Sequence, residues 1–543
     1  MKDGSIVIAA TFTAEPIQDS LAFWLEKSGN QAEICFAPYN QVFQQLLDPN
    51  SLFQKNTSGI NIALLRFEDW YRYEKDPARY QEMVRKNLDE FGNALKTFLG
   101  FAPCVVCVCP PSPNALADAN TQHFFEQIEE TLGNITAREN NLFLTKSQEI
   151  AAAYPVEKYY DAYGDKQGHI PYTTIFFTAL GTLLARRIYA LRSKPRKVII
   201  LDCDQTLWQG ICGEDGPEGV SISRAYHDLQ EFMLKQQANG RLLCLCSKNN
   251  ERDVWEVFDK HPEMPLKREH LAAWRINWRP KSENLRSLAD ELNLGLDSFI
   301  LVDDNPMECS EVRANCPGVE VLQLPENAQR IPAFLSHVWA FDQLKVTSED
   351  QQRTLMYGQN KAREAVRQAS SSFESFLAGL QLNVEISTLS ADQTERVAQL
   401  TQRTNQFNLK TIRRSAQEIL ALHQSGALLC ETVSAKDRFG DYGLIGAMFF
   451  SKKDNLLDVD TFILSCRALG RGIENRMLVH LTTWARQQNC DYVNFSYRAS
   501  TKNQPIFDFL HKTGGHFEKQ TQDGADFCLP VGFLLNPSQA IKN

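Results

Sequence analysis

Short apolar runs that end in polar residues recur along the first part of the chain. They cover residues 4–12, 32–36, 60–65 and 101–109. Residues 19–27 carry apolar side chains at helical spacing, and the Ala- and Leu-rich stretch 172–192 predicts a longer helix. Strands that alternate with helical stretches are typical of an α/β layer. The polar segment 193–197, which contains a helix-stopping proline, follows, so we expect a first α/β domain over residues 1–192.

Continuous apolar runs dominate the next part of the chain. They cover residues 197–201, 241–247, 298–304 and 319–323, with helical patterns over 223–237 and 282–293 between them. Uninterrupted apolar runs predict strands that are buried on both faces of a parallel sheet. We therefore expect a second α/β domain over residues 195–345, built on a Rossmann-like parallel sheet.

The pattern changes again after residue 345. Residues 346–380 are polar, charged and compatible with a helical connector. Strand-like runs follow at 381–386, 428–433, 443–450, 457–464 and 492–497, with helices expected from Asp392 and from about residue 473 to Trp484. This mixture predicts an α+β domain over residues 381–543, the third of the chain.

Composition narrows the class of protein. The 543 residues are 43% hydrophobic and 23% charged, as in ordinary globular proteins. A net charge of -9 argues against nucleic acid as a partner. The apolar core of the N-terminus is too short for a secretory signal, and no apolar run approaches the roughly 18 residues of a membrane helix. We expect a cytosolic protein without a membrane partner, whose 14 scattered cysteines are reduced and mostly buried.

Polar side chains gather where the buried strands of the second domain end. They are Asp202, Asp204 and Thr206 after the first strand, Ser247 and Asn249 at the second, Lys281 before a helix, and Asp303 and Asp304 after the third. Ligands of open α/β sheets bind beyond the carboxyl ends of the strands, so these side chains are expected at one edge. Carboxylates that only cap strand ends are the alternative, which would not explain two pairs on buried strands.

This set has the chemistry that phosphoryl transfer requires. Clustered carboxylates repel unless a cation lies among them, and Mg²⁺ prefers oxygen ligands. One carboxylate can attack phosphorus, while the next protonates the leaving oxygen and later activates water. A serine hydroxyl and a lysine ammonium can hold the phosphoryl oxygens.

The ordered set Asp-x-Asp-x-Thr, strand-Ser, Lys and Asp-Asp resembles the haloacid-dehalogenase (HAD) superfamily of phosphotransferases. The resemblance implies that Asp202 is the nucleophile and Asp204 the general acid/base. It also implies that Ser247 and Lys281 bind phosphate. Mg²⁺ would be held by Asp202, Asp204 and Asp303, with Asp304 as a further ligand.

Segments 202–216 and 302–308 are similar to the FkbH-like branch of that superfamily, apart from Gln205 and Gln209, where the branch has Asn and Gly. Members of that branch take the acyl phosphate of 1,3-bisphosphoglycerate, remove the other phosphate and load the glyceryl group onto the phosphopantetheine thiol of an acyl carrier protein in polyketide or related biosynthesis. The resemblance implies the same function here. A plain Mg²⁺-dependent metabolite phosphatase with partner-binding flanking domains is the alternative; a non-enzymatic scaffold fits the intact carboxylates poorly.

Acyl transfer can pass through a cysteine thiolate. Cys203 lies between the carboxylates but should point away from them. Cys212, on a loop expected to cover the site, is the better candidate, because a nearby cation would lower its thiol pKa. Packing of both as small buried residues remains open.

The flanking domains also resemble known families. Asp165-Lys-Gln-Gly-His169 is similar to the late Asp/His block of SGNH hydrolases, but the first strand ends without their Gly-Asp-Ser nucleophile. Thr11 and Thr13 fit turn-satisfying hydroxyls better than nucleophiles, so we predict a non-catalytic recognition domain.

The C-terminal domain carries Arg467-x-x-Gly470-x-Gly472 after a strand and before a helix. This loop resembles the acyl-CoA loop of GNAT acetyltransferases, where backbone N–H groups bind phosphate. We expect Arg467, Gly470 and Gly472 to hold the phosphopantetheine arm of the carrier protein rather than CoA. Glycines that serve packing alone are the alternative.

Overall fold

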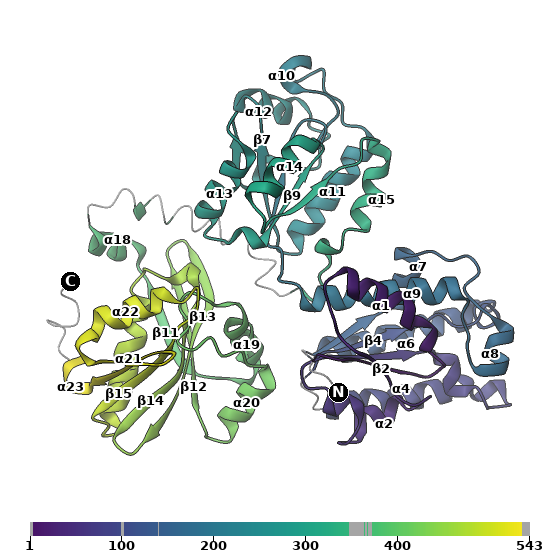
Figure 1. Ribbon diagram of the computed structural model, residues 1–543, viewed down its shortest axis with the longest axis horizontal. Helices are drawn as coiled ribbons and strands as arrows, with labels where there is room; N and C mark the ends of the chain where they lie inside the picture. The colour runs from purple at the N-terminus through teal and green to yellow at the C-terminus, as the bar shows by residue number, and fades with distance from the viewer. Residues whose placement is uncertain are drawn as a thin grey trace. The chain divides into compact units, whose positions relative to one another are not determined.

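The computed structural model describes residues 4–98, 102–139, 141–346, 363, 366–367 and 372–534. It divides into two compact units, Met1–Thr354 and Leu355–Asn543. The first unit contains two five-stranded sheets and the second contains one seven-stranded sheet (Figure 1). Most of the predicted connector, 346–380, lies outside the described residues, apart mainly from helix α18 (Phe373–Leu380).

The first sheet is parallel, in the order β2-β1-β3-β4-β5. Its strands are β1 (Ile6–Ala10), β2 (Ile34–Phe36), β3 (Ile60–Leu65), β4 (Cys104–Val108) and β5 (Leu142–Thr145). The helices are α1 (Gln18–Lys27), α2 (Val42–Leu47), α3 (Leu52–Lys55), α4 (Tyr80–Thr97), α5 (Pro113–Leu116), α6 (Ala119–Ala137), α7 (Ser147–Ala153), α8 (Ala162–Gly168) and α9 (Thr174–Arg192). Alternate strand residues pack on α1 and α9 on one face and on α2, α4 and α6 on the other (Figure 1). Burial of both faces explains the nearly continuous apolar runs.

The second sheet is also parallel, in the order β10-β9-β6-β7-β8. Its strands are β6 (Val198–Leu201), β7 (Leu242–Ser247), β8 (Leu271–Ile276), β9 (Phe299–Asp303) and β10 (Glu320–Gln323). The helices are α10 (Cys212–Asp215), α11 (Arg224–Ala238), α12 (Glu251–Lys260), α13 (Lys281–Leu292), α14 (Pro306–Asn315) and α15 (Ile331–Ser336). The first strand along this segment, β6, lies between β7 and β9. The crevice where strand order reverses is therefore next to Asp202.

The seven-stranded sheet has the order β11-β12-β13-β14-β15-β17-β16. Its strands are β11 (Asn383–Thr388), β12 (Leu429–Asp437), β13 (Gly440–Lys453), β14 (Leu456–Leu464), β15 (Tyr492–Arg498), β16 (Glu518–Thr521) and β17 (Gly524–Pro530). The helices are α19 (Thr394–Arg403), α20 (Ala416–Gln424), α21 (Ile473–Gln487), α22 (Gln504–Gly514) and α23 (Val531–Leu534). Neighbouring strands are antiparallel except for the parallel pair β14 and β15. The predicted fold class, two parallel α/β sheets followed by an α+β domain, is confirmed.

One helix among the described residues, α9, is long and apolar enough to cross a membrane by length and composition alone. In the structure 56% of its most apolar window is buried. Leu180, Leu183 and Leu184 pack in the core of the first sheet. A core helix can have the same composition as a membrane-spanning helix. The burial of its leucines gives α9 the environment of a core helix.

Candidate active site

Strands β6 and β9 bring two acidic pairs together at the carboxyl edge of the second sheet. Leu201 and Val302 are partners in the parallel ladder, and Asp202 N–H donates to the Val302 carbonyl at 3.1 Å. This register puts Asp202 beside Asp303, each one residue past those partners. The predicted meeting of the two strand ends is therefore present.

Three carboxylates form a cluster there. Oxygens of Asp202, Asp303 and Asp304 all lie within 4.8 Å of one another. Asp303 is fully buried and Asp202 is 7% exposed. Asp202 Oδ1 is buried, and the side chain beside it is the Lys281 ammonium. Three converging carboxylate oxygens fit the ligand preference of a divalent cation such as Mg²⁺.

Lys281 reaches into this cluster from the first turn of α13. Its Nζ lies 2.5 Å from Asp303 Oδ2 and 3.0 Å from Asp202 Oδ1, and the residue is 2% exposed. Burial alone would lower the pKa of this lysine, but the two carboxylates outweigh it and raise the pKa. The ammonium is therefore held charged where a phosphoryl oxygen would need a partner.

The three carboxylates repel one another even with Lys281 beside them. Burial and the charge of Asp202 raise the pKa of Asp304 to about 6. The same two causes raise the pKa of Asp303 to about 6 against the opposing charge of Lys281. One lysine therefore does not neutralise three carboxylates, and a cation at this position would remove the remaining repulsion.

Asp204 departs from its expected place. We expect it among the Mg²⁺ ligands, with Asp202 and Asp303, but its carboxylate is not part of the cluster. Asp204 Oδ1 accepts from Trp208 Nε1 at 2.8 Å and from Cys212 N–H at 3.0 Å, and Oδ2 accepts from Asn249 Nδ2 at 3.0 Å. These three donors hold the Asp204 carboxylate outside the cluster and leave Oδ2 with a further acceptor position.

The residues predicted to bind phosphate differ in what their side chains contact. Ser247 lies at the end of β7, and its Oγ accepts from Asn249 Nδ2 at 3.0 Å, so Asn249 joins Ser247 to Asp204. Thr206 is buried, with its Oγ1 3.5 Å from Asp304 Oδ1. Trp208 was not predicted as a site residue, because an indole near a carboxylate in sequence gives no sign that it is a donor.

The cysteines do not have the expected environment. Cys203 is fully buried, and burial raises its thiol pKa well above the ordinary value. Cys212 is 2% exposed, and its Sγ lies 3.6 Å from Asn249 Oδ1. Burial, followed by the charge of Asp204, raises the pKa of Cys212 to about 12. Without a cation beside it, this buried thiol has the environment of a packed residue, and the lowering of its pKa by a nearby Mg²⁺ stays a prediction.

The threonines of the first sheet serve structure. Thr11 Oγ1 donates to Asp69 at 2.7 Å and accepts from Arg66 N–H at 3.0 Å, and the residue is 2% exposed. Thr13 Oγ1 donates to the Gly168 carbonyl at 2.7 Å. These bonds support the prediction that neither threonine is a nucleophile.

The predicted Asp/His pair of this sheet lies in a network of buried charges. Arg66 forms an ion pair with Asp165 at 2.8 Å, and His169 Nε2 lies 2.8 Å from Asp69 Oδ1. Arg66 and Asp69 were not predicted as members of this network, because neither belongs to a recognisable motif. Asp165 and His169 are therefore engaged in holding the end of the sheet together.

The glycine loop of the third sheet is formed as predicted. Gly470 and Gly472 have φ of 70° and 72°, a region that favours glycine, and α21 begins at the next residue. Burial raises the pKa of the Glu474 carboxyl, in the first turn of α21. The side chain of Arg467 lies outside the described residues.

Comparison with known proteins gives one informative likeness. The chain is similar to a crystal structure of the N-terminal part of the protein BF1531 from Bacteroides fragilis, which contains a phosphatase domain complexed with Mg. The TM-score is 0.54 and the identity is 24%, over 63% of this chain and 94% of that one. The likeness establishes a shared fold.

Two acetyltransferase structures match a smaller part of the chain. The ribosomal-protein-S18-alanine N-acetyltransferase of Escherichia coli matches with 11% identity and a TM-score of 0.21, over 27% of this chain and 94% of that one. The PaiA N-acetyltransferase of Thermoplasma acidophilum, in complex with coenzyme A, matches with 17% identity and a TM-score of 0.21, over 27% and 98%. No family model and no curated protein matches the chain.

Proposed function

We propose that the second sheet carries a Mg²⁺-dependent phosphatase site. The observation that supports it most is the convergence of Asp202, Asp303 and Asp304 around Lys281. Asp202 is the nucleophile, because it directly follows β6 and its carboxylate lies beside both Lys281 and the other two acidic residues. Mg²⁺, held by these three carboxylates, would supply positive charge to the transferring phosphoryl group.

The other residues of the site have supporting functions. The Lys281 ammonium holds a phosphoryl oxygen as negative charge spreads in the transition state. Asp204 is the general acid/base, fixed in position by Trp208, Asn249 and the Cys212 amide. Attack of Asp202 forms an aspartyl-phosphate and releases the leaving oxygen, which takes its proton from Asp204. Asp204 then removes a proton from the water that hydrolyses the intermediate.

We further propose that the substrate is 1,3-bisphosphoglycerate and that the glyceryl group is loaded onto an acyl carrier protein. Support comes from the motif at 202–216 and 302–308, which resembles the FkbH-like branch. The glycine loop before α21 is the proposed contact for the phosphopantetheine arm. The buried, protonated thiol of Cys212 favours direct attack by the carrier thiol on the acyl phosphate.

A loading assay separates this function from that of a plain metabolite phosphatase. The full chain is incubated with Mg²⁺, 1,3-bisphosphoglycerate labelled in its glyceryl carbons, and a holo acyl carrier protein. Label on the carrier in the presence of the wild-type chain, and its loss with the apo carrier, is the expected result. Phosphate release without carrier labelling would leave only the phosphatase.

A further inference from the structure

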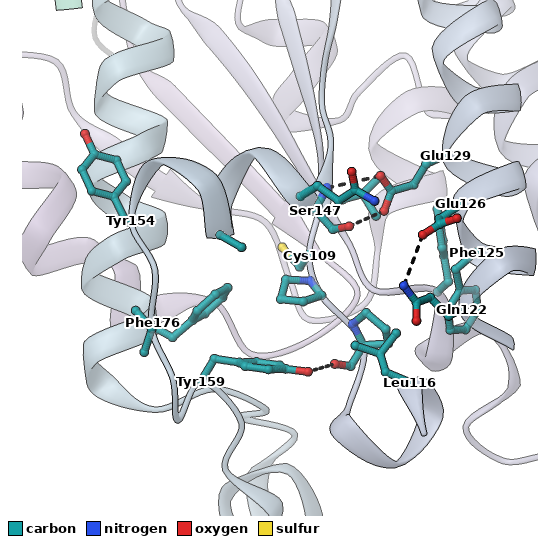
Figure 2. Close-up of a pocket in the computed structure, with 17 residues that line it drawn as sticks. Cys109, Leu116, Gln122, Phe125, Glu126, Glu129, Ser147, Tyr154, Tyr159 and Phe176 are labelled. Atoms are coloured by element: carbon teal, nitrogen blue, oxygen red, sulfur yellow. Dashed lines mark hydrogen bonds between the residues drawn. The ribbon is translucent and has the colours of Figure 1, made fainter. Parts of the chain in front are cut away.

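A cavity of about 230 Å³ lies in the first sheet, apart from the carboxylate site. It is found past the carboxyl end of β4, where Cys109 and two prolines follow the strand, and residues of α6, α7 and α9 line it. Figure 2 shows Cys109 between two walls, with Tyr159 and Phe176 on one side and Phe125 on the other. The position beyond a strand end is a usual place for a ligand in an α/β sheet.

The walls of the cavity are mostly apolar and aromatic. Phe67, Phe125, Tyr159 and Phe176 line it, together with Leu116 and other apolar side chains. The Tyr159 hydroxyl donates to the Pro111 carbonyl at 2.8 Å, so this tyrosine is fixed in place. The volume is below the roughly 300–1,000 Å³ usual for ligand pockets, so the occupant is small.

Two carboxylates supply the charge of the cavity. Glu129 is 7% exposed and accepts from Ser147 Oγ at 2.5 Å and Ser147 N–H at 3.3 Å, and Glu126 lies one helical turn away on α6 (Figure 2). None of the described residues that line the cavity is Lys, Arg or His. The positive charge that acts on Glu129 comes from Lys146, which is exposed and does not line the cavity.

We propose that this cavity binds a small organic amine, with its apolar body between the aromatic walls and its ammonium group against Glu129 and Glu126. An anion would be buried beside two carboxylates without a cation, which is costly. A neutral ligand would leave Glu129 without a charged partner inside the cavity, and Glu126 would have only His123, whose Nδ1 lies 3.8 Å away and which does not line the cavity. An ammonium gains charge-assisted hydrogen bonds and the attraction of the ring faces.

This inference does not depend on the proposed function. Phosphorylated glycerate and phosphopantetheine are anionic, so the cavity selects a different molecule from the one that the second sheet acts on. Binding of an amine in this cavity would need no nucleophile in the domain of the first sheet.

Calorimetric titration of the full chain with three probes of similar size tests the proposal. The probes are 2-phenylethylamine, 2-phenylethanol and 3-phenylpropanoate, which differ in charge at neutral pH. We expect the amine to bind at least about tenfold more tightly than the alcohol, as for a hydrogen bond to a charged group, and the anion to bind most weakly. Equal binding of amine and alcohol, preference for the anion, or no saturable binding of the amine would overturn the proposal.

Variants locate the binding. Glu129→Gln keeps the size of the side chain and should weaken amine binding at least about tenfold while leaving alcohol binding unchanged. Glu130→Gln on the same helix is the matched control, because Glu130 is exposed and does not line the cavity. If Glu129→Gln fails to fold, the exposed Glu126→Gln replaces it. Amine affinity that is unchanged in the folded variant contradicts the assignment.

Discussion

Gln205, which follows Asp204 and precedes Thr206, has an unusual backbone conformation. Its φ is 54°, in the left-handed region that residues other than glycine and asparagine seldom adopt. The chain must reverse here, because Thr206 and Leu207 N–H groups both donate to the Cys203 carbonyl. The strain at Gln205 is therefore part of how Asp202 and Asp204 are placed.

Replacing this residue tests that reading. Gln205→Asn should raise the free energy of unfolding by roughly 0.5–1 kcal/mol, because asparagine tolerates the left-handed region better. The measurement is the midpoint of denaturant unfolding, compared between variants whose unfolding free energy falls with denaturant at the same slope. Gln205→Ala is the control, and its free energy of unfolding should not rise. A less stable asparagine variant would show that the conformation carries no such cost.

The raised pKa of Asp304 gives a prediction for the metal-free protein. Its folded pKa is about 6, against about 4 in an unfolded chain. The folded state therefore binds this proton more tightly, and ionisation of Asp304 lowers stability as pH rises through this window. Asp304→Asn should be more stable than the wild type at pH 7.5, and the difference should fade as pH falls from 6 to 4.

Thermal unfolding in chelator across that pH range measures this difference. Added Mg²⁺ should stabilise the wild type and should stabilise Asp304→Asn much less, since the variant lacks one ligand oxygen. A variant that is less stable at pH 7.5 in chelator would contradict the repulsion described for this cluster.

At the scale of elements, the loop from β6 to α10 holds Asp204 by main-chain as well as side-chain donors. Cys212 contributes its backbone N–H, while its thiol packs beside Asn249. Cys212→Ser should therefore keep carrier loading within about threefold of the wild type, because the amide donor and a side-chain donor both remain. Mass spectrometry of the loading reaction, with Cys466→Ser at an exposed cysteine as control, measures it. Abolished loading, with a glyceryl adduct on wild-type Cys212, would restore the thiolate relay.

The central strands of the second sheet were predictable, whereas its edge strand β8 was not. The runs that became β6, β7 and β9 are continuously apolar, because helices cover both sides. Strand β8 was missed because it lies at the edge of its sheet and half of its six residues are only partly buried, so Trp274 and Arg275 interrupt the apolar run.

Some residues of the candidate site could also be predicted from the sequence, and others could not. Asp202, Lys281 and Asp303 could be predicted because strand ends and their order fix where such side chains meet. The contacts of Asp204 could not, because they depend on the path of the loop after Gln205. The burial of Cys212 depends on that path as well, so the rise of its thiol pKa could not be predicted from the sequence.

At the scale of the whole molecule, the proposed phosphatase site and the glycine loop belong to different compact units. Arg467→Glu in the loop should therefore lower carrier loading, by roughly tenfold as for loss of a charged contact, and leave phosphate release unchanged. Parallel assays of carrier labelling and phosphate release measure the two effects, with Arg498→Glu on β15 as the control. Equal loss of both activities would mean that the two units do not divide the reaction in this way.

The account depends most on the three carboxylates at the ends of β6 and β9. Release of inorganic phosphate from 1,3-bisphosphoglycerate by the purified chain, above the rate without enzyme, tests them most directly. We predict release that requires Mg²⁺ and stops in excess chelator, and an Asp202→Asn variant that binds the substrate but stays at the uncatalysed rate. Undiminished release by that variant, or by the wild type in chelator, would contradict the account.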